Sequence, residues 1–143
     1  MKTKIIAEIG INHNGNLDSA IQLIYAAKDC QVDAVKFQKR DLKSIYTEEI
    51  LDDSNTAEWN FDYLLPQLKK LELSQDDFFQ ISDLCSRLEL DLIVTPMDTT
   101  SADFIKELKL NAIKIASADM TNFELIDHCA MFGLPLLIST GMW

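Results

Sequence analysis

Short apolar runs alternate along the chain with longer segments in which apolar residues recur every three or four positions. The runs are rich in Val, Ile and Leu, a composition typical of buried strands. They predict strands over residues 4–9, 34–38, 91–95, 112–116 and 134–139. Because strands that alternate with helices are joined by right-handed crossovers, the pattern predicts one α/β domain with a parallel sheet.

The segments between these runs have the periodicity and the capping residues of helices. Asn16 is a suitable N-cap for a helix over residues 17–29, whose apolar positions form one stripe. Helical spacing, with capping boxes at residues 74–77 and 121–124, predicts further helices over residues 61–71, 74–88, 101–108 and 121–132. Gly133 is a suitable stop for the last of them.

Residues 39–60 depart from this rhythm, because they form a long polar segment that includes Arg40, Tyr46 and Trp59 among acidic residues. Long ordered loops in compact domains often carry function. A solvated excursion would explain the same composition. We therefore expect a loop here, and the sequence leaves both interpretations open.

Two lysines occupy predicted strands, Lys36 and Lys114. An unpaired ammonium is costly to bury, so each needs an opposite charge. One interpretation is a structural ion pair with an inward carboxylate such as Glu8. The other is a site for a multiply charged anion, which two strand lysines favour more than one would.

Polar residues follow the predicted strands at their carboxyl ends. In parallel α/β folds these ends meet at one edge of the sheet, where working residues gather. The group comprises Glu8, Lys36, Gln38, Thr95, Lys114, Ser117, Ser139 and Thr140. Two ammoniums, one carboxylate and several hydroxyls suit a ligand that has both a phosphate and a carboxylate, with one general acid or base beside it.

Composition excludes several classes of partner. The 143 residues are 48% hydrophobic and 25% charged, and the formal net charge is -10, so no basic stripe exists for nucleic acid. No apolar run reaches the ~18 residues that would span a membrane, and the first residues lack the apolar core of a signal peptide. The three cysteines, at 30, 85 and 129, lack metal-ligand spacing. We expect reduced thiols on helices of a cytoplasmic protein.

Five motifs in this order resemble the amino-terminal half of the sialic acid synthase (N-acetylneuraminate synthase) family. They are Ala7-Glu-Ile-Gly-Ile-Asn-His-Asn-Gly15, Val35-Lys-Phe-Gln-Lys39, Thr95-Pro96, Lys114-Ile-Ala-Ser-Ala-Asp119 and Ser139-Thr-Gly-Met142. The resemblance covers nearly the whole chain. It implies an α/β fold that forms the amino-terminal part, about five βα units, of a TIM (β/α)8 barrel.

The resemblance also implies a reaction. Enzymes of the family condense phosphoenolpyruvate with N-acetylmannosamine or a related amino sugar, release phosphate, and use a divalent metal, manganese or magnesium. By resemblance Lys36, Thr95, Lys114, Ser117 and Ser139 would bind phosphoenolpyruvate. Glu8 would be an acid, base or orienting group near the reactive end of the sugar, and Gln38 would lie close to it. Residues 39–60 would contribute to sugar selectivity.

The chain departs from the family in its length. A complete barrel takes about 250 residues, so we expect residues 1–143 to be a single partial domain, without the later strands and the antifreeze-like domain. The metal-ligating histidines of the family would lie in those strands, and we expect no metal ligand here, neither His13 nor His128. Open strand edges pair with other chains, so we expect a homo-oligomer or a sheet flattened to a flavodoxin-like form.

Two alternatives to the synthase remain. A Schiff-base aldolase, or another phosphate-handling α/β barrel enzyme, would use Lys36 or Lys114 as its nucleophile. A non-catalytic barrel fragment would keep the fold as a binding or assembly module. The lack of metal ligands, which leaves this chain alone without a full active site, keeps the second alternative open.

Overall fold

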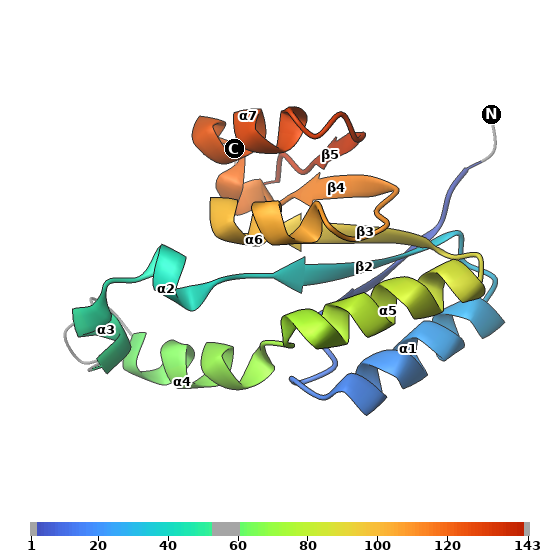
Figure 1. Ribbon diagram of the computed structural model, residues 1–143, viewed down its shortest axis with the longest axis horizontal. Helices are drawn as coiled ribbons and strands as arrows, with labels where there is room; N and C mark the ends of the chain where they lie inside the picture. Colours follow the sequence, from blue (N-terminus) through green and yellow to red (C-terminus); the bar gives the residue numbers. More distant parts are fainter. Residues whose placement is uncertain (1–2, 53–60, 142–143) are drawn as a thin grey trace.

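Five parallel strands form one sheet in the computed structural model, which describes residues 3–52 and 61–141 (Figure 1). The strands are β1 (Ile6–Gly10), β2 (Ala34–Lys39), β3 (Asp91–Pro96), β4 (Ala112–Ile115) and β5 (Leu136–Ile138). They lie in the order β1-β2-β3-β4-β5, with every neighbouring pair parallel. This sequential order confirms the predicted barrel-type arrangement. The flattened flavodoxin-like alternative is wrong, because that sheet has the order 2-1-3-4-5.

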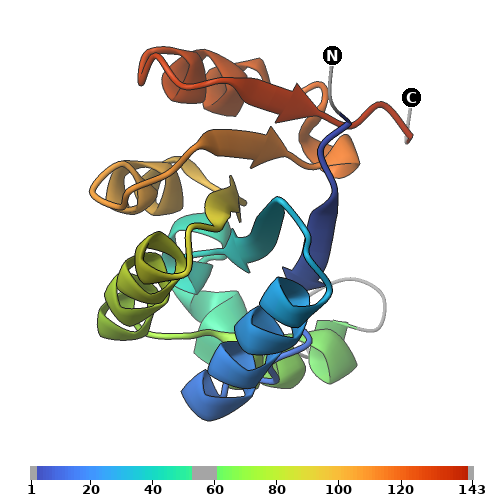
Figure 2. The same ribbon diagram turned by 90° about the vertical axis from the view of Figure 1, so that its right-hand side faces the viewer.

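Helices connect the strands. They are α1 (Leu17–Asp29), α2 (Leu42–Ile45), α3 (Glu48–Asp52), α4 (Phe61–Leu71), α5 (Gln75–Arg87), α6 (Thr99–Ile105), a 3₁₀ helix (Ser117–Asp119) and α7 (Phe123–Ala130). Figure 2 shows the strands following an arc from β1 to β5, with α1, α5, α6 and α7 outside it. None of the helices in the described ranges is long and apolar enough to cross a membrane.

Local signals located two of these helices correctly. The Asn16 side chain accepts a hydrogen bond from the Ser19 amide at 2.8 Å and caps α1, as predicted. The capping box predicted at the start of α5 is present, since Ser74 and Asp77 each accept a hydrogen bond from the backbone amide of the other.

Other predicted boundaries are wrong. Helix α7 begins after Asn122, whose side chain accepts from the Leu125 amide, so Thr121 is not its cap, and the helix ends at Ala130. Helix α6 is capped by Asp98 and stops at Ile105. Strand β5 starts only after Pro135, which has no amide hydrogen for the ladder.

The segment predicted as a loop, residues 39–60, is partly helical. Strand β2 includes Lys39, and α2 and α3 follow it, with Asp41 capping α2 through a hydrogen bond from the Ser44 amide. Residues 53–60, which include Trp59, lie outside the described residues. In Figure 1, α2 and α3 lie beyond the arrowheads of β2, β3 and β4, on the side where the strands end.

The two faces of the sheet have different cores. The outer core lies between the strands and the helices, and includes Val35 and Phe37 of β2 packed with Ile24 of α1 and Ile81 of α5. The inner face has a smaller apolar layer, formed by Ala34, Ile93, Ala112 and Ile6. Strand side chains alternate between faces, so the residues that follow this inner layer by two positions share its face.

The cysteines are all free, as predicted. Cys85 and Cys129 are buried in α5 and α7, and burial raises the pKa of their thiols to about 12 and about 11. Cys30 is exposed and caps the end of α1 rather than lying within it.

The edge positions of β1 and β5 agree with the expectation of exposed edges, whereas pairing between copies stays a prediction.

Candidate active site

The inner face of the sheet carries a polar layer directly above its small apolar one. The parallel register places Glu8 beside Lys36 and Gln38 beside Thr95. Ala112 of β4 belongs to the inner apolar layer, and Lys114, two residues further along the strand, shares its face. Four neighbouring strands therefore direct charged or polar side chains to one face, as the alternation of strand side chains predicted.

Lys36 and Glu8 form an ion pair. The Lys36 Nζ atom lies 2.8 Å from Glu8 Oε2, and the exposed fractions of the two side chains are 7% and 59%. The interpretation of Lys36 as a member of an ion pair is therefore correct. Because the Glu8 carboxylate stays open to solvent, it is also accessible to a bound molecule.

Lys114 has only neutral partners among the described residues. Its ammonium donates hydrogen bonds to the Ser139 hydroxyl at 2.6 Å and to the Ile115 carbonyl at 2.7 Å. Burial, and then the nearby Lys36 ammonium, lower the pKa of Lys114, while Glu8 acts in the opposite direction. Lys36 is thus paired with Glu8, whereas Lys114 has no carboxylate partner among the described residues, and a bound anion would stabilise both ammoniums.

Thr95 supplies an unused hydroxyl to this face. The residue is 1% exposed, and its Oγ1 atom has no hydrogen-bond partner in the described part of the chain. Buried hydroxyls are nearly always paired. Because solvent does not reach this hydroxyl, a ligand oxygen would contact it only if the neighbouring side chains move.

Ser117 is the predicted site residue with the least support. It is half-buried and opens the 3₁₀ helix that follows β4. Within the described residues its side chain makes no hydrogen bond, unlike that of Ser139.

The structure brings Glu8, Lys36, Lys114 and Ser139 together, and places Gln38 and Thr95 side by side one step further along their strands.

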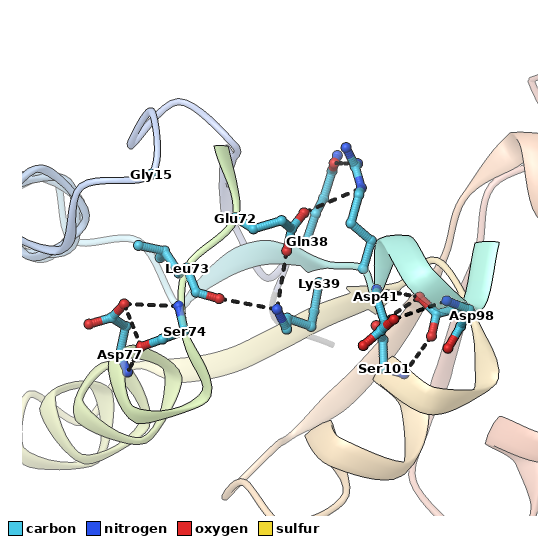
Figure 3. Close-up of polar contacts among 12 residues, drawn as sticks. Gly15, Gln38, Lys39, Asp41, Glu72, Leu73, Ser74, Asp77, Asp98 and Ser101 are labelled. Atoms are coloured by element: carbon cyan, nitrogen blue, oxygen red, sulfur yellow. Dashed lines mark hydrogen bonds and ion pairs between the residues drawn. The ribbon is translucent and has the colours of Figure 1, made fainter. Parts of the chain in front are cut away.

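Sequence reasoning missed a polar network at the end of β2, drawn in Figure 3. Glu72, from the turn between α4 and α5, lies 3.1 Å from Lys39 Nζ and 3.5 Å from Arg40 Nε. Burial raises the pKa of Glu72, against the opposing effect of Lys39 and Arg40. No local signal marks Glu72, because its partners are more than 30 residues away in the sequence.

Asp98 was also missed, although a signal for it exists. Its carboxylate accepts hydrogen bonds from the Ser101 amide and hydroxyl and from the Asp41 amide, at 2.6, 2.8 and 2.8 Å. Figure 3 shows Asp98 between the end of β2 and the start of α6. An Asp three residues before a Ser at a helix start is a recognisable N-cap pattern.

His13 does not belong to the polar layer. It is 2% exposed and its ring lies 5.9 Å from that of Phe37, which is part of the outer core. Burial lowers the pKa of His13, and Nδ1 accepts a hydrogen bond from the Gly15 amide. A neutral imidazole in this setting is a packing element of the first loop.

The divalent metal implied by the family resemblance does not fit the described residues. Among the side chains of residues 3–52 and 64–141, no three from His, Cys, Asp or Glu are placed to hold a metal ion. Glu8 is the one acidic side chain of the inner polar layer described above, and it is paired with Lys36.

Comparisons with known proteins are consistent with this geometry. The sequence model of the NeuB family matches residues 23–143. The chain is 40% identical over 142 residues to the N,N'-diacetyllegionaminic acid synthase of Legionella pneumophila, covering 96% of this chain and 39% of that protein. It is 39% identical over 139 residues to the N-acetylneuraminate-9-phosphate synthase of Drosophila melanogaster, covering 96% of this chain and 37% of that protein.

A solved structure has the same fold. The N-acetylneuraminic acid synthetase of Leptospira borgpetersenii, determined in complex with citrate, superposes with a TM-score of 0.82 at 26% identity. The match covers 100% of this chain and 46% of that one. The chain therefore spans less than half the length of the relatives it matches, and its sheet corresponds to the first part of a TIM-type barrel.

Proposed function

The chain belongs to the NeuB family, and on that premise we propose that it provides the phosphoenolpyruvate-binding part of a nonulosonic acid synthase. The enzyme would condense phosphoenolpyruvate with N-acetylmannosamine or a related amino sugar to give a sialic-type acid and phosphate. The relatives named above are synthases of such acids. The identity of the two substrates, phosphoenolpyruvate and the amino sugar, is part of the proposal.

The observation that supports the proposal most directly is that the Lys36 and Lys114 ammoniums lie near each other on the inner face, and Glu8 is paired with Lys36 alone in the described part of the chain. Phosphoenolpyruvate carries a phosphate and a carboxylate, and two ammoniums on β2 and β4, the strands on either side of β3, match that pair of anionic groups. Ser139, which accepts from Lys114, and the unpaired Thr95 hydroxyl would add neutral donors. The Ser117 hydroxyl, at the start of the 3₁₀ helix after β4, would be a further donor.

The chemistry needs groups of this kind. The enol carbon of phosphoenolpyruvate forms a bond to the aldehyde carbon of the open-chain sugar. Water then adds to the carbon that carries the phosphate, and the carbon–oxygen bond breaks to release phosphate. The lysines would stabilise the negative charge on the leaving phosphate. Glu8, exposed at 59%, would take a proton from the attacking water or orient it.

Replacing either lysine should weaken phosphoenolpyruvate binding. We expect Lys36→Met and Lys114→Met in the full-length protein each to lower the affinity by at least about 10-fold, since a hydrogen bond to a charged group contributes about 1.5–3 kcal/mol. Calorimetric titration would measure this. Lys109→Met is the matched control, because Lys109 forms an exposed salt bridge with Asp83. Unchanged affinity in both strand variants would contradict the proposal.

A Schiff-base aldolase is the second candidate, supported by the lowered pKa of Lys114. Borohydride reduction in the presence of pyruvate would trap a covalent adduct on an aldolase lysine and none on a synthase. A third possibility, a non-catalytic binding module, predicts no turnover by the full-length protein with phosphoenolpyruvate, amino sugar and divalent metal. Release of phosphate under those conditions would exclude it.

A further inference from the structure

We propose that Arg40 is a positioning residue, which orients the side-chain amide of Gln38 toward the amino sugar. The inference rests on the proposed function, in which Gln38 lies near the reactive end of the sugar. The inference adds Arg40, which the sequence motif does not distinguish, to the residues of the proposed site. It also adds the contact between Arg40 and Glu72, which only the tertiary structure reveals.

The hydrogen bond between Arg40 and Gln38 determines which way the amide lies. Arg40 Nη2 donates to Gln38 Oε1 at 3.1 Å. A guanidinium has donors only, so its partner on the amide must be the oxygen. The amide NH₂ is therefore left for other partners. A Cβ atom placed on Gly10 would lie 3.8 Å from Gln38 Nε2, so the NH₂ group lies against the end of β1, two residues after Glu8.

The guanidinium is itself held on a second side. Arg40 Nε lies 3.5 Å from Glu72 Oε1, and the exposed fractions of the two side chains are 10% and 19%. Glu72 is fixed in turn by Lys39, whose ammonium also donates to the Leu73 carbonyl at 3.1 Å. A planar guanidinium with contacts on two of its nitrogens has a defined orientation, which a lysine ammonium could not reproduce.

An amide fixed in this way presents a donor instead of an acceptor. An NH₂ group that lies against Gly10, at the end of the strand that carries Glu8, can hydrogen-bond to the carbonyl or hydroxyl oxygen of the reacting sugar. If the Gln38 amide were free to flip, its Oε1 atom would replace the NH₂ group in part of the molecules and would repel the sugar oxygen. Arg40 shares the Glu72 carboxylate with Lys39. Its hydrogen bond to Gln38 is the contact through which it would act on the sugar.

The kinetic test is a double-mutant cycle in the full-length protein. We expect Arg40→Met to lower kcat by about 10- to 100-fold, the usual loss when a reacting group is misplaced. The KM for phosphoenolpyruvate should stay within about 2-fold of the parent value, because a larger rise would indicate that Arg40 binds this substrate directly. In a Gln38→Met background the same substitution should have no further effect. Arg40→Lys should recover only part of kcat. Arg87→Met, at the exposed end of α5, is the matched control and should match the parent protein.

Three kinetic outcomes would overturn the inference: equal losses in the two backgrounds, a large rise in the KM for phosphoenolpyruvate, or full activity of Arg40→Lys. Failure of the parent protein to release phosphate would instead contradict the proposed function. The two failures are therefore distinguishable.

A spectroscopic readout tests the positioning without activity. The side-chain amide signals of Gln38, identified by their loss in Gln38→Met, should report a rigid amide in the parent and in Arg87→Met. Arg40→Met should shift these signals and make the amide mobile, while thermal denaturation verifies that the variant is folded. An unchanged Gln38 signal in folded Arg40→Met would overturn the inference.

Discussion

The Lys36 ammonium is nearly enclosed by the sheet, yet its partner, the Glu8 carboxylate, lies largely in solvent. The atoms are 2.8 Å apart, and the exposed fractions of the side chains are 7% for Lys36 and 59% for Glu8. In a buried ion pair, removing one partner leaves the other charge uncompensated. Here only one of the two charges is buried, so the two possible removals should have unequal effects.

We therefore expect Glu8→Ala to destabilise the protein more than Lys36→Met. Glu8→Ala leaves a buried ammonium without its carboxylate and should lower the free energy of unfolding by about 1–3 kcal/mol. Lys36→Met leaves a carboxylate that water still solvates, and should change the free energy of unfolding by less than about 1 kcal/mol. Urea denaturation of the two variants would measure the difference. Greater destabilisation by Lys36→Met would contradict this account of the pair.

The affinity for phosphoenolpyruvate should fall at alkaline pH because of Lys114. Burial and the Lys36 ammonium lower the pKa of Lys114 below 10.5 in the free protein, and a bound anion would raise it. Binding is then strongest where Lys114 is already protonated, and it weakens as the pH rises through the lowered pKa, at values below 10.5. The second ionisation of phosphate groups has a pKa of about 6 and is essentially complete by about pH 8, so titrations from about pH 8 upward report on the protein.

Lys114→Met serves as the control for that titration. Its affinity should be lower throughout, and the part of the alkaline decline that belongs to Lys114 should be absent. An identical pH profile in the parent and in Lys114→Met would assign the decline to another group.

Thr95→Val should separate ligand binding from stability. The substitution keeps the shape of the side chain and removes a buried hydroxyl that has no partner among the described residues. Burying such a hydroxyl is unfavourable, so the free energy of unfolding of the ligand-free protein should stay the same or rise. The affinity for phosphoenolpyruvate should fall by about 5-fold, as for the loss of one neutral hydrogen bond. Denaturation and calorimetry would measure the two quantities.

The matched control is Thr100→Val, since the Thr100 hydroxyl accepts a hydrogen bond from Ser44 on the exposed surface. It should leave the affinity unchanged. If Thr95→Val destabilises the ligand-free protein by more than about 1 kcal/mol, the hydroxyl has a structural partner and the interpretation fails.

Two glycines with the same backbone conformation should tolerate alanine very differently. Gly15 has φ +71° and Gly133 has φ +70°, both in the left-handed region. A Cβ atom at Gly15 would lie 1.9 Å from the Lys70 carbonyl oxygen, whereas nothing lies within 4 Å of one at Gly133. Gly133→Ala should therefore cost only the conformational strain, about 1–2 kcal/mol.

Gly15→Ala should cost several kcal/mol more, because the first loop and α4 must move apart. The two variants would be compared by urea denaturation. Equal losses of the free energy of unfolding would show that the close approach of Gly15 to α4 does not constrain the fold.

Much of the fold was predictable because its signals are local. Asn16 and Ser74 cap α1 and α5 as their sequence positions predicted, and each strand of the sheet lies where an apolar run occurs. One error falls where two local signals compete. Thr121 and Asn122 are adjacent capping residues, and Asn122 is the one that caps α7.

The candidate site was predictable to the extent that strand alternation determines it. Lys36 and Gln38 had to share a face, and the carboxyl ends of parallel strands had to meet. The pairing of Lys36 with Glu8, and of Lys114 with Ser139, required the register between strands. Asp98 could have been recognised as an N-cap, although not as the acceptor for the Asp41 amide.

The sequence alone therefore determined the order of strands and helices and the residue types that reach the inner face of the sheet, because periodicity and capping act over a few residues. The tertiary structure decided which charges meet. Glu72 reaches Lys39 and Arg40, and the Thr95 hydroxyl is buried without a partner from the described residues, only because distant segments pack together at the end of β2 and β3. Electrostatic contacts of this kind depend on distance and burial in space, and neither is encoded in local sequence pattern.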